Sequence, residues 1–378
     1  FLGSEKMFCV RDIRPERWHS MRVSALRLHQ FRCFGSLSCE LGEGVNLFTG
    51  DNAQGKTSIV ESVCVLLRLQ SPRTSTTMDL AQFGKDAFGI RAVVDDEREL
   101  THSWQAGKRR LALDGEPCRK SGDYLEASGL VVWMGNEDIQ LVRGAGDTRR
   151  RYLDFAASQL YPDYRPALLA YEKALRSRNF LLKRDASPNW RQIDAYSEVL
   201  VRHGEIVMQR RAELVQQLQP WAGEAHTHVG GSREVLTIEY VPGSTPDFAQ
   251  ALAESQPEEL RRRVTIVGPH RDDLALVIDS RSAGQFASEG QQRTVALSLK
   301  LAQARLLQER RQITPIILVD DIFGELDPGR RNALLSYLPA SAQKLITTTH
   351  LDWLDADASS LSQAARFHVN AGTLQRMS

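Results

Sequence analysis

Residues 50–57 have the residue types and spacing of a phosphate-binding P-loop, with two glycines, a lysine and then a threonine. Glycines let a backbone wrap a phosphate with its N–H groups pointing inward, and a helix that follows adds its positive N-terminus. Lys56 is expected to reach the β- and γ-phosphates of ATP, and the Thr57 hydroxyl to ligate Mg²⁺. The predicted ATP-binding residues are Gly50, Asp51, Asn52, Ala53, Gln54, Gly55, Lys56, Thr57 and Ser58.

A second motif places two carboxylates directly after an apolar run. Residues 316–319 are all aliphatic and lead into Asp320 and Asp321. A buried parallel strand that delivers acids at its carboxyl end is the arrangement of a Walker B site. Asp320 is expected to hold the hydration shell of Mg²⁺, and Asp321 stands where a base or water-orienting group belongs. Taken alone, the pair would better suit a strand that ends in a capped turn, and it is the P-loop elsewhere in the chain that favours the Walker B interpretation.

A histidine follows another predicted buried strand, residues 344–349, near the C-terminus. His350 would lie on the same sheet edge as the acidic pair. A histidine at that place is expected to sense the γ-phosphate, although a histidine after a strand is more often an ordinary loop residue. The predicted catalytic set is Lys56, Asp320, Asp321 and His350.

The elements that must hold these groups can be predicted from periodicity. Helical spacing predicts helices at 56–69 and 290–311. The order of strand, loop and helix around the P-loop is the order that its chemistry needs. Alternating or apolar segments predict strands at 23–28, 45–48, 130–134, 235–241, 264–267, 274–278, 315–319 and 344–349, with several antiparallel strands between 87 and 113.

The middle of the chain is predicted to form a helical hairpin. Long amphipathic patterns at 163–184 and 190–219 are separated by a short break at 185–188. Two such helices with a short connection pack antiparallel. At 1.5 Å per residue each would be about 30–45 Å long, enough to project from a compact core.

Composition indicates an ordinary globular protein of 378 residues, with 42% hydrophobic and 25% charged residues. No apolar run is long enough to span a bilayer, and five cysteines without metal-ligand spacing fit a reducing cytosol. Net charge is only +1, but residues 143–222 hold 14 Lys/Arg against 9 Asp/Glu, so the rest sums to −4. A solvated helix face would explain this local excess as well.

Further motifs resemble those of ABC-type ATPases that act on DNA, the SMC-like group. The P-loop has asparagine at its third position, residues 286–293 (FASEGQQR) resemble the signature motif, and residues 324–327 (GELD) resemble the D-loop, with Asp327 as its acid. Residues 265–274 (TIVGPHRDDL) and 149–154 (RRRYLD) resemble stretches particular to the RecF family of bacterial recombination mediators. The resemblance runs from residue 21 to the C-terminus, with all motifs in order.

The resemblance implies an α/β fold. It predicts an ABC-type P-loop ATPase head, built from a mixed sheet and an antiparallel β-lobe, with an inserted helical hairpin. Residues 1–20 would be an extension, native or added, with little functional weight. Residues 21–145 would form the first half of the head, 146–225 the helical arm, and 226–378 the second half of the head.

The resemblance also implies a composite site. The signature residues Ser288, Glu289, Gly290 and Gln291 would close over the γ-phosphate held by a second copy of the chain, because serine and glycine N–H groups at a helix N-terminus bind phosphate. ATP would then favour a homodimer with two sandwiched nucleotides, and hydrolysis would release it. Ser288 would equally serve as a simple helix cap.

Three positions depart from the family pattern or leave a choice open. Asp321 is one methylene shorter than the glutamate usual in SMC-type sites, which suits slow turnover. Asn136 stands at the Q-loop position in place of glutamine. Arg32 matches a basic residue that approaches the nucleotide in relatives, but a surface arginine would look the same. No role for His270 or Arg271 follows from the residues.

The family implies binding to gapped duplex or to junctions between single and double strands, without base-specific readout. It also implies work beside RecR and RecO in loading RecA. The short hairpin suggests a compact clamp, in which basic side chains line a groove and contact phosphates. The candidates are Arg149, Arg150, Arg151, Arg165, Arg176, Arg178, Lys183, Arg184, Arg202, Arg210 and Arg211.

Three functional hypotheses remain open on these residues. The leading one is a weak DNA-dependent ATPase that clamps DNA as a dimer. A second is a nucleotide-gated scaffold in which hydrolysis is nearly incidental. A transporter ATPase subunit is the third, and the basic hairpin and the 270-residue separation of Gly50 from Asp320 speak against it.

Overall fold

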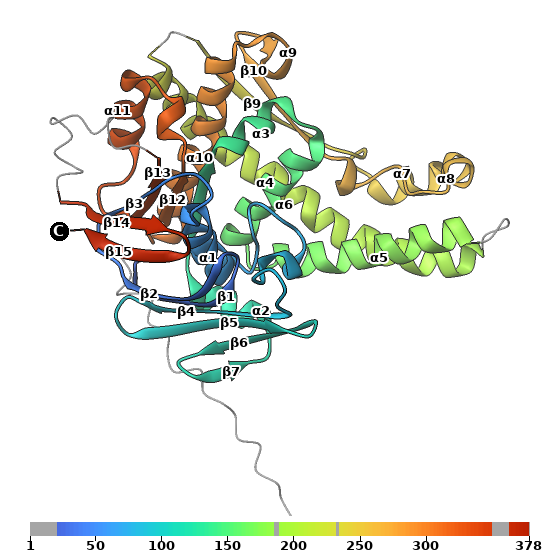
Figure 1. Cartoon of the computed structure of the whole chain (residues 1–378). Coiled ribbons are helices and arrows are strands. Elements are labelled where there is room, and N and C mark those ends of the chain that lie inside the picture. Colours follow the sequence, from blue (N-terminus) through green and yellow to red (C-terminus); the bar gives the residue numbers. More distant parts are fainter. Residues whose placement is uncertain (1–20, 185–188, 232–233, 350–362, 378) are drawn as a thin grey trace, which may run out of the picture.

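The computed structural model describes residues 21–184, 189–231, 234–349 and 363–377. They form an α/β head from which a helical arm projects (Figure 1). The head is layered: an antiparallel sheet, helix α1 (Lys56–Arg68), a mostly parallel sheet, and a group of helices on its far side. The fold is thus the α/β class that the sequence predicted.

The mostly parallel sheet lies at the centre, with strand order β15-β14-β3-β13-β12-β8. Only β15 runs antiparallel to its neighbour. Ile317 and Val319 enter the core on the helical side, while Ile316 and Leu318 enter the core around α1. Burial on both faces explains why the strands read as continuous apolar runs. The strands are β3 (Val45–Thr49), β8 (Val131–Gly135), β12 (Ile316–Asp320), β13 (Lys344–Thr348), β14 (Ala365–Asn370) and β15 (Thr373–Met377).

An antiparallel sheet forms the β-lobe below α1 (Figure 1). Its strand order is β2-β1-β4-β5-β6-β7, and α2 (Ser121–Ser128) closes its edge. Every residue of α1 except Thr57 is buried, because the helix is enclosed between the two sheets. The strands are β1 (Val23–Phe31), β2 (Phe34–Glu40), β4 (Ala87–Val94), β5 (Arg98–Gln105), β6 (Lys108–Leu113) and β7 (Glu116–Cys118).

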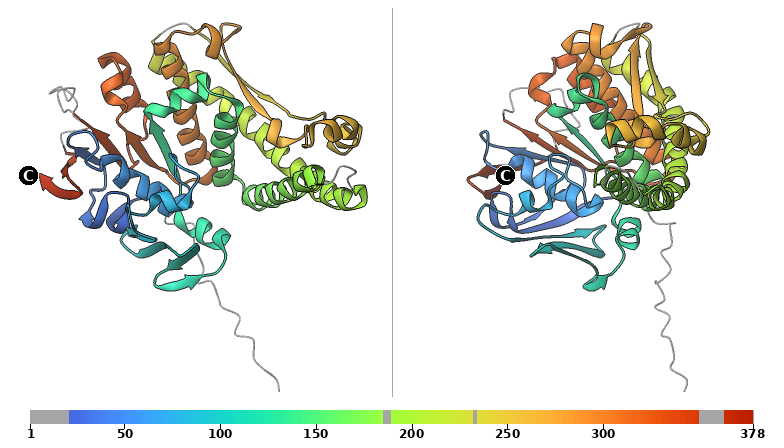
Figure 2. Two further views of the ribbon diagram at one scale, coloured as in Figure 1. Left: turned by 45° about the vertical axis from the view of Figure 1, so that its right-hand side comes forward. Right: turned by 90° about the vertical axis from the view of Figure 1, so that its right-hand side faces the viewer.

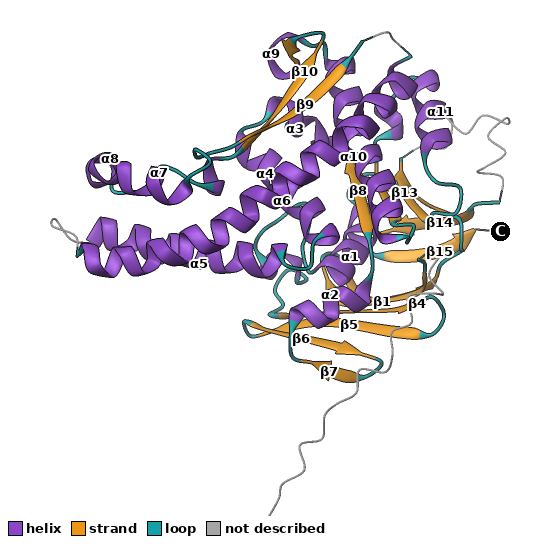
Figure 3. Cartoon of the chain, turned by 180° about the vertical axis from the view of Figure 1, so that it is seen from behind, coloured by secondary structure: helices purple, strands orange, loops and turns teal. Residues whose placement is uncertain are grey.

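Helices cover the other face of the central sheet, as the view from behind shows (Figure 3). Helix α10 starts beside a small three-stranded sheet and runs down to the central sheet (Figure 1). The remaining elements of this layer are α3 (Gln140–Arg143), α4 (Gly146–Leu160), α9 (Ala283–Phe286), α10 (Glu289–Arg311), α11 (Pro328–Tyr337), β9 (Leu236–Val241), β10 (Asp273–Ile278) and β11 (Arg281–Ser282).

The arm consists of α5 (Tyr164–Arg184) and the outer half of α6 (Trp190–Gly230). The hairpin is confirmed, but α6 continues 11 residues beyond the predicted end at 219, through Pro220. Its inner half is buried in the head core, which offsets the hydrogen bond that a proline removes. The arm also includes α7 (Phe248–Glu254) and α8 (Gln256–Arg262), which lie along it (Figures 2 and 3).

The predicted arm boundaries 146–225 therefore need correction. Helix α4 and the inner part of α6 belong to the head core. Phe248 and Leu252 of α7, in contrast, pack with Tyr171, Ala174 and Leu200 of the arm hairpin. The chain thus returns to the arm after leaving it, which local pattern does not reveal.

The predicted strand at 264–267 is wrong, because these residues form an irregular turn. The Thr265 backbone N–H and hydroxyl both donate to the Asn179 side chain, at 2.8 Å each, so that its backbone N–H serves a side chain of the arm instead of a neighbouring strand. After this turn a short 3-10 helix, η4 (Pro269–Arg271), leads into β10.

Candidate functional site

The P-loop is held in shape by close packing around Gly55. This residue has a φ of 112°, and a Cβ there would lie 2.6 Å from the sulfur of Cys33 and 2.8 Å from the ring of Phe34. Only glycine fits both the conformation and the space. The Lys56 ammonium donates to the carbonyls of Gly50 (2.6 Å) and Asp51 (2.8 Å), so it lies inside the curve of the loop.

Thr57 and Asp320 meet although 263 residues separate them. The Thr57 hydroxyl donates to Asp320 Oδ1 at 2.7 Å, and the Thr347 hydroxyl donates to the same oxygen at 2.8 Å. Burial raises the pKa of Asp320, an effect opposed by these two hydrogen bonds and by the charge of Arg73. Burial lowers the pKa of the Lys56 ammonium, against the opposing charges of Asp321, Asp320 and Asp51. A hydroxyl and a carboxylate at the mouth of a P-loop are the donors that a magnesium–nucleotide complex requires.

Asp321 is placed by a strained turn. Its φ is 52°, a conformation uncommon for a residue with a side chain. The Asn136 side-chain amide donates to the Asp321 carbonyl at 2.9 Å, and the Asp321 N–H donates to the Thr347 hydroxyl at 3.0 Å. The Q-loop position and the Walker B turn are therefore in direct contact.

Sequence reasoning missed a carboxylate beneath the P-loop. Glu61 of α1 is fully buried and forms an ion pair with Arg32, with N···O distances of 2.6 and 2.9 Å. The guanidinium of Arg73 lies 3.5 Å from the same carboxylate. Arg32 also donates to the Asp79 carbonyl at 2.7 Å, so it ties three segments together at the side of the loop. The sequence did carry a signal for this carboxylate, because Glu61 is an acid on the apolar face of the predicted helix 56–69.

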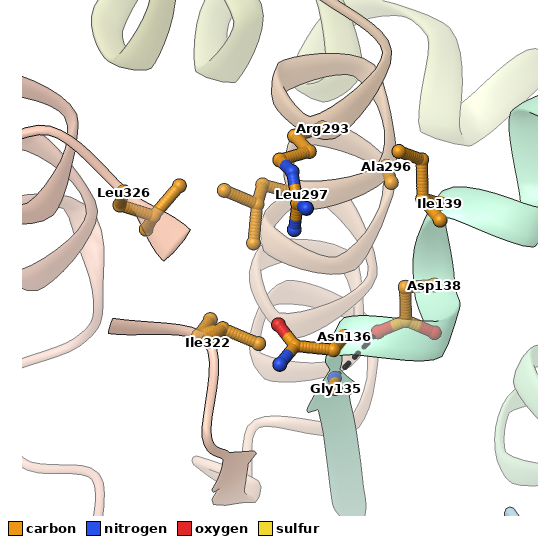
Figure 4. A pocket seen from close by; sticks show the side chains of 9 residues that line it. All are labelled: Gly135, Asn136, Asp138, Ile139, Arg293, Ala296, Leu297, Ile322 and Leu326. Carbon is orange, nitrogen blue, oxygen red and sulfur yellow. Dashed lines mark hydrogen bonds between the residues drawn. The ribbon is translucent and has the colours of Figure 1, made fainter. Parts of the chain in front are cut away.

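A small cavity of about 20 Å³ joins three of the predicted motifs (Figure 4). That volume suffices for about one water molecule. The Asn136 side chain, the signature helix α10 and the segment after the Walker B strand share its wall. The lining residues are Gly135, Asn136, Asp138, Ile139, Arg293, Ala296, Leu297, Ile322 and Leu326.

The signature residues lie at the start of α10. Ser288 is the N-cap, and with Gln291 it forms a capping box in which each side chain accepts from the other residue's backbone N–H. A Cβ on Gly290 would lie 2.8 Å from the guanidinium of Arg330. Asp327 caps α11 by accepting from the Arg330 N–H at 2.9 Å. The signature and D-loop are thus neighbours.

The signature and the P-loop occupy different parts of the chain's surface. Helix α10 begins near α9, whereas the P-loop lies where β3 meets α1 (Figure 1). Ser288 and Glu289 are exposed, and Phe286 just before them is 68% exposed. Within one copy of the chain, these residues point to solvent.

The predicted basic residues separate into exposed and buried groups. Arg151, Arg176, Lys183, Arg184 and Arg202 are exposed.

Others are engaged. Arg149 forms an ion pair with Asp273 at 2.6 Å, and Arg150 donates to the Asp272 carbonyl at 2.8 Å. Arg165 is half-buried, and Arg210 forms an ion pair with Asp163 at 2.8 Å.

Two of the predicted DNA contacts, Arg178 and Arg211, are wrong. Arg178 is fully buried and pairs with Glu259 at 2.7 Å. Arg211 is buried between Asp154 (2.6 Å) and Asp272 (2.7 Å). Neither can reach a phosphate outside the protein, and both instead fasten the arm to its surroundings.

His350 and residues 1–20 lie outside the described residues. Within the described ranges, no cluster of three or more His, Cys, Asp or Glu side chains could hold a metal ion by itself. The same part of the chain contains no helix with the length and apolarity needed to cross a bilayer.

Comparison of the fold with solved structures places the head in a class. The chain superposes on the Smc head domain of Pyrococcus furiosus, solved with the C-terminal domain of ScpA, with a TM-score of 0.54 at 13% identity, over 94% of this chain and 96% of that one. The protein therefore has the fold of an ABC-type ATPase head of the SMC group. A family model described as an AAA domain also matches residues 25–203.

Sequence similarity is more specific. The chain belongs to the RecF family: it is 36% identical to the DNA replication and repair protein RecF of Thermosynechococcus vestitus, over 95% of this chain and 98% of that protein. A solved structure of the recombination mediator RecF with ATP, assigned to the RecFOR pathway, superposes with a TM-score of 0.86 at 27% identity, over 96% of this chain and 99% of that one. The resemblance predicted from the motifs is confirmed.

Proposed function

We propose that this protein is an ATP-dependent DNA-binding protein of recombinational repair, whose dimer clamps DNA when ATP is bound. The observation that carries the proposal is the contact of Thr57 with Asp320, 2.7 Å apart at the mouth of the P-loop. A relative of the same fold was solved with ATP and is assigned to the RecFOR pathway. We infer that this chain binds ATP and Mg²⁺ and acts in the same kind of pathway.

The residues of the site have distinct roles in this proposal. Lys56, which now satisfies loop carbonyls, would turn its ammonium to the β- and γ-phosphates. Thr57 and Asp320 would hold magnesium, the first as a ligand and the second through its hydration shell. Bound Mg²⁺ would supply charge neutralisation at the phosphates. Thr347 keeps the Asp320 carboxylate oriented throughout.

Hydrolysis would depend on Asp321. Hydrogen bonds with Asn136 and Thr347 hold the backbone of Asp321 in place. The point from which its side chain projects is therefore fixed beside the site. A shorter acid than glutamate places its carboxylate farther from an attacking water, which suits slow, DNA-stimulated turnover. His350 would complete the site as a sensor of the γ-phosphate.

Dimerisation would follow from the exposed signature. Ser288 and Gly290 lie at the start of a 23-residue helix, and such a terminus favours an anion. Two copies related by a twofold axis would each give the other these groups. ATP would then shift the population toward the closed dimer, because it contacts both surfaces only there.

The closed dimer would hold DNA between its arms through exposed basic side chains. The family relationship favours gapped duplex or junction DNA, with RecR and RecO as partners in loading RecA. Phosphate contacts of this kind are independent of sequence and sensitive to salt.

Sedimentation of the full chain tests the proposal. With ATP, Mg²⁺ and gapped DNA the protein should sediment as a DNA-bound dimer, and Lys56→Ala should remain monomeric. A wild-type monomer under all conditions would contradict the clamp.

The alternative is a nucleotide-gated scaffold in which hydrolysis is incidental. Asp321→Asn separates the two. The clamp predicts a variant that dimerises on DNA, fails to release it and does not support repair in cells. Unchanged repair by this variant would favour the scaffold.

A further inference from the structure

The outer half of the arm carries an open hollow of about 420 Å³, away from the P-loop and the signature. Its lining comes from the last turns of α5 and one residue of α6. These turns of α5 are at the outer end of the arm (Figures 1 and 2). The lining residues are Arg176, Ser177, Phe180, Leu181, Arg184 and Tyr196.

Two aromatic side chains are exposed in this hollow. Phe180 is 60% exposed and Tyr196 38% exposed. The arm's own apolar cluster is complete without them, since it is built from Tyr171, Leu200 and Phe248 with their neighbours. The two rings therefore contribute little to the fold and leave their surfaces open to a ligand.

Cations flank the Phe180 ring along the helix. Arg176 and Arg184 are one turn before and one turn after it, on a line of about 12 Å at 1.5 Å per residue. The guanidinium of Arg184 lies 5.9 Å from the centre of the Phe180 ring. Lys183 is exposed beside them. Glu172 lies 3.8 Å from Arg176 as a counter-charge, and both side chains are too exposed for that pair to be strong.

We propose that this hollow, the arm platform, binds single-stranded nucleic acid, with a base stacked on Phe180 or Tyr196 and the adjoining phosphates on Arg176 and Arg184. An alternation of ring and cation matches the alternation of base and phosphate along an unpaired strand. Every base has a face to stack, so the contact is independent of sequence. A duplex offers its phosphates to such a surface but keeps its base faces inside the stack.

This inference deepens the proposed function, on which its DNA partner rests. The clamp needs ATP and the head, whereas the arm platform needs neither. A protein with both would hold duplex between its subunits and an unpaired strand on the arm, and so would select a junction by its structure.

The test uses the full chain without nucleotide and a labelled thymidine oligonucleotide of about 15 residues, with binding followed by fluorescence anisotropy. Phe180→Ala should weaken binding by about 5-fold to 150-fold, the range expected for losing one stacked base. The dependence of log affinity on log salt should keep its slope in this variant. Arg176→Ala should instead lower that slope by about 0.7.

Phe83→Ala is the matched control, because Phe83 is another exposed phenylalanine but lies on the head. It should bind the oligonucleotide like the wild type. A 2-aminopurine base in the oligonucleotide should change its fluorescence on binding the wild type and not on binding Phe180→Ala.

Equal affinity of Phe180→Ala and the wild type would overturn the proposal. So would wild-type protein that ignores the oligonucleotide but binds an acidic peptide at this hollow. ATP-dependent dimerisation on duplex, measured in parallel, should be the same in Phe180→Ala and the wild type. If the wild type did not dimerise on duplex with ATP, the clamp would be contradicted, but the proposal for the arm platform would be unaffected.

Discussion

At the scale of single residues, Arg178 is a fully buried cation of the arm. Its guanidinium donates to Glu259, Thr265 and Ser197, at 2.7, 2.7 and 3.0 Å. Because the ion pair is fully buried, neither charge has access to water. The pair joins α5 to α8. It therefore fastens α8, which the chain forms after it has returned to the arm, to the arm hairpin.

We therefore expect Arg178→Met to lower the free energy of unfolding by about 3–5 kcal/mol, because Glu259 would be left buried and unpaired. Urea unfolding followed by far-UV circular dichroism measures this. The double variant Arg178→Met/Glu259→Leu should recover part of the loss. Arg176→Met, at a site with 72% side-chain exposure, should stay within about 0.5 kcal/mol of the wild type. Identical unfolding of Arg178→Met and Arg176→Met would contradict this account.

His270 is a second residue whose role appears only in the structure. The Thr265 carbonyl lies 3.0 Å from Nε2, so Nε2 carries the proton, and Nδ1 accepts from the Tyr171 hydroxyl at 2.6 Å. Burial, together with the charges of nearby arginines, Arg271 first among them, lowers the pKa of His270 to about 4, against the opposing effect of the hydrogen bond to Thr265. The folded protein thus keeps this imidazole neutral.

Acidification should therefore destabilise the protein through His270. Between about pH 6.5 and pH 4 the unfolded chain binds a proton that the folded chain does not, so stability falls as pH falls, by up to about 3 kcal/mol. His270→Gln preserves both hydrogen bonds and removes the titration, so its stability should fall less over that window. Other buried histidines act equally in both proteins and cancel in the difference. Parallel pH profiles of the two proteins would exclude the effect.

At the scale of elements, the start of α10 combines a structural and a binding role in one residue. Ser288 caps the helix, and the same end of the helix is proposed to meet the γ-phosphate in the second subunit. Two substitutions separate these roles. Aspartate preserves the cap, because its carboxylate accepts the same N–H, while alanine removes it.

We expect Ser288→Asp to keep its unfolding free energy within about 0.5 kcal/mol of the wild type but to lose ATP-dependent dimerisation, because a carboxylate repels the phosphates. Ser288→Ala should lose about 1 kcal/mol of stability through the missing cap. Denaturation and sedimentation of the two variants measure this. Normal dimerisation of Ser288→Asp would show that the start of α10 does not meet the nucleotide.

At the scale of the whole molecule, the proposal requires that each site take its P-loop from one copy and its signature from the other. Mixing two defective variants tests this directly. A heterodimer of Lys56→Ala and Ser288→Asp has one site with both defects and one site with neither. Neither variant alone should hydrolyse ATP.

The equimolar mixture should recover up to about half of wild-type activity, because ATP can close only the mixed dimer, which has one intact site of two. Steady-state ATP hydrolysis in the presence of DNA is the measurement. Each variant mixed with excess wild type provides the control for exchange of subunits. An inactive mixture, with exchange shown, would place both motifs in one copy of the chain.

Much of the fold and of the nucleotide site could be predicted because the signals are local. The P-loop is one contiguous segment, and the strand before Asp320 is apolar on both faces because it is central in the sheet. Carboxyl ends of parallel strands meet at one edge, so the two motifs could be expected to meet without knowledge of the path between them. The structure places Thr57 against Asp320 as that rule requires.

The basic residues of the arm show where such prediction fails. Exposed and buried arginines look alike in a list of charges. A signal existed for Arg178, since it stands at helical spacing with Tyr171, Ala174 and Leu182 on the buried stripe of α5. The acid that neutralises it lies 81 residues away and only tertiary contact could reveal it.

The sequence by itself determined the P-loop, the acid-ended strand, the hairpin and the family, because each depends on spacing within a short segment. The tertiary structure decided which cations face solvent, that α7 and α8 complete the arm, and that residues 264–267 form an irregular turn bonded to the arm instead of a strand. These outcomes depend on partners far away in the chain. Local periodicity records which face of an element is apolar, but the partner that covers this face is settled only when the chain has folded.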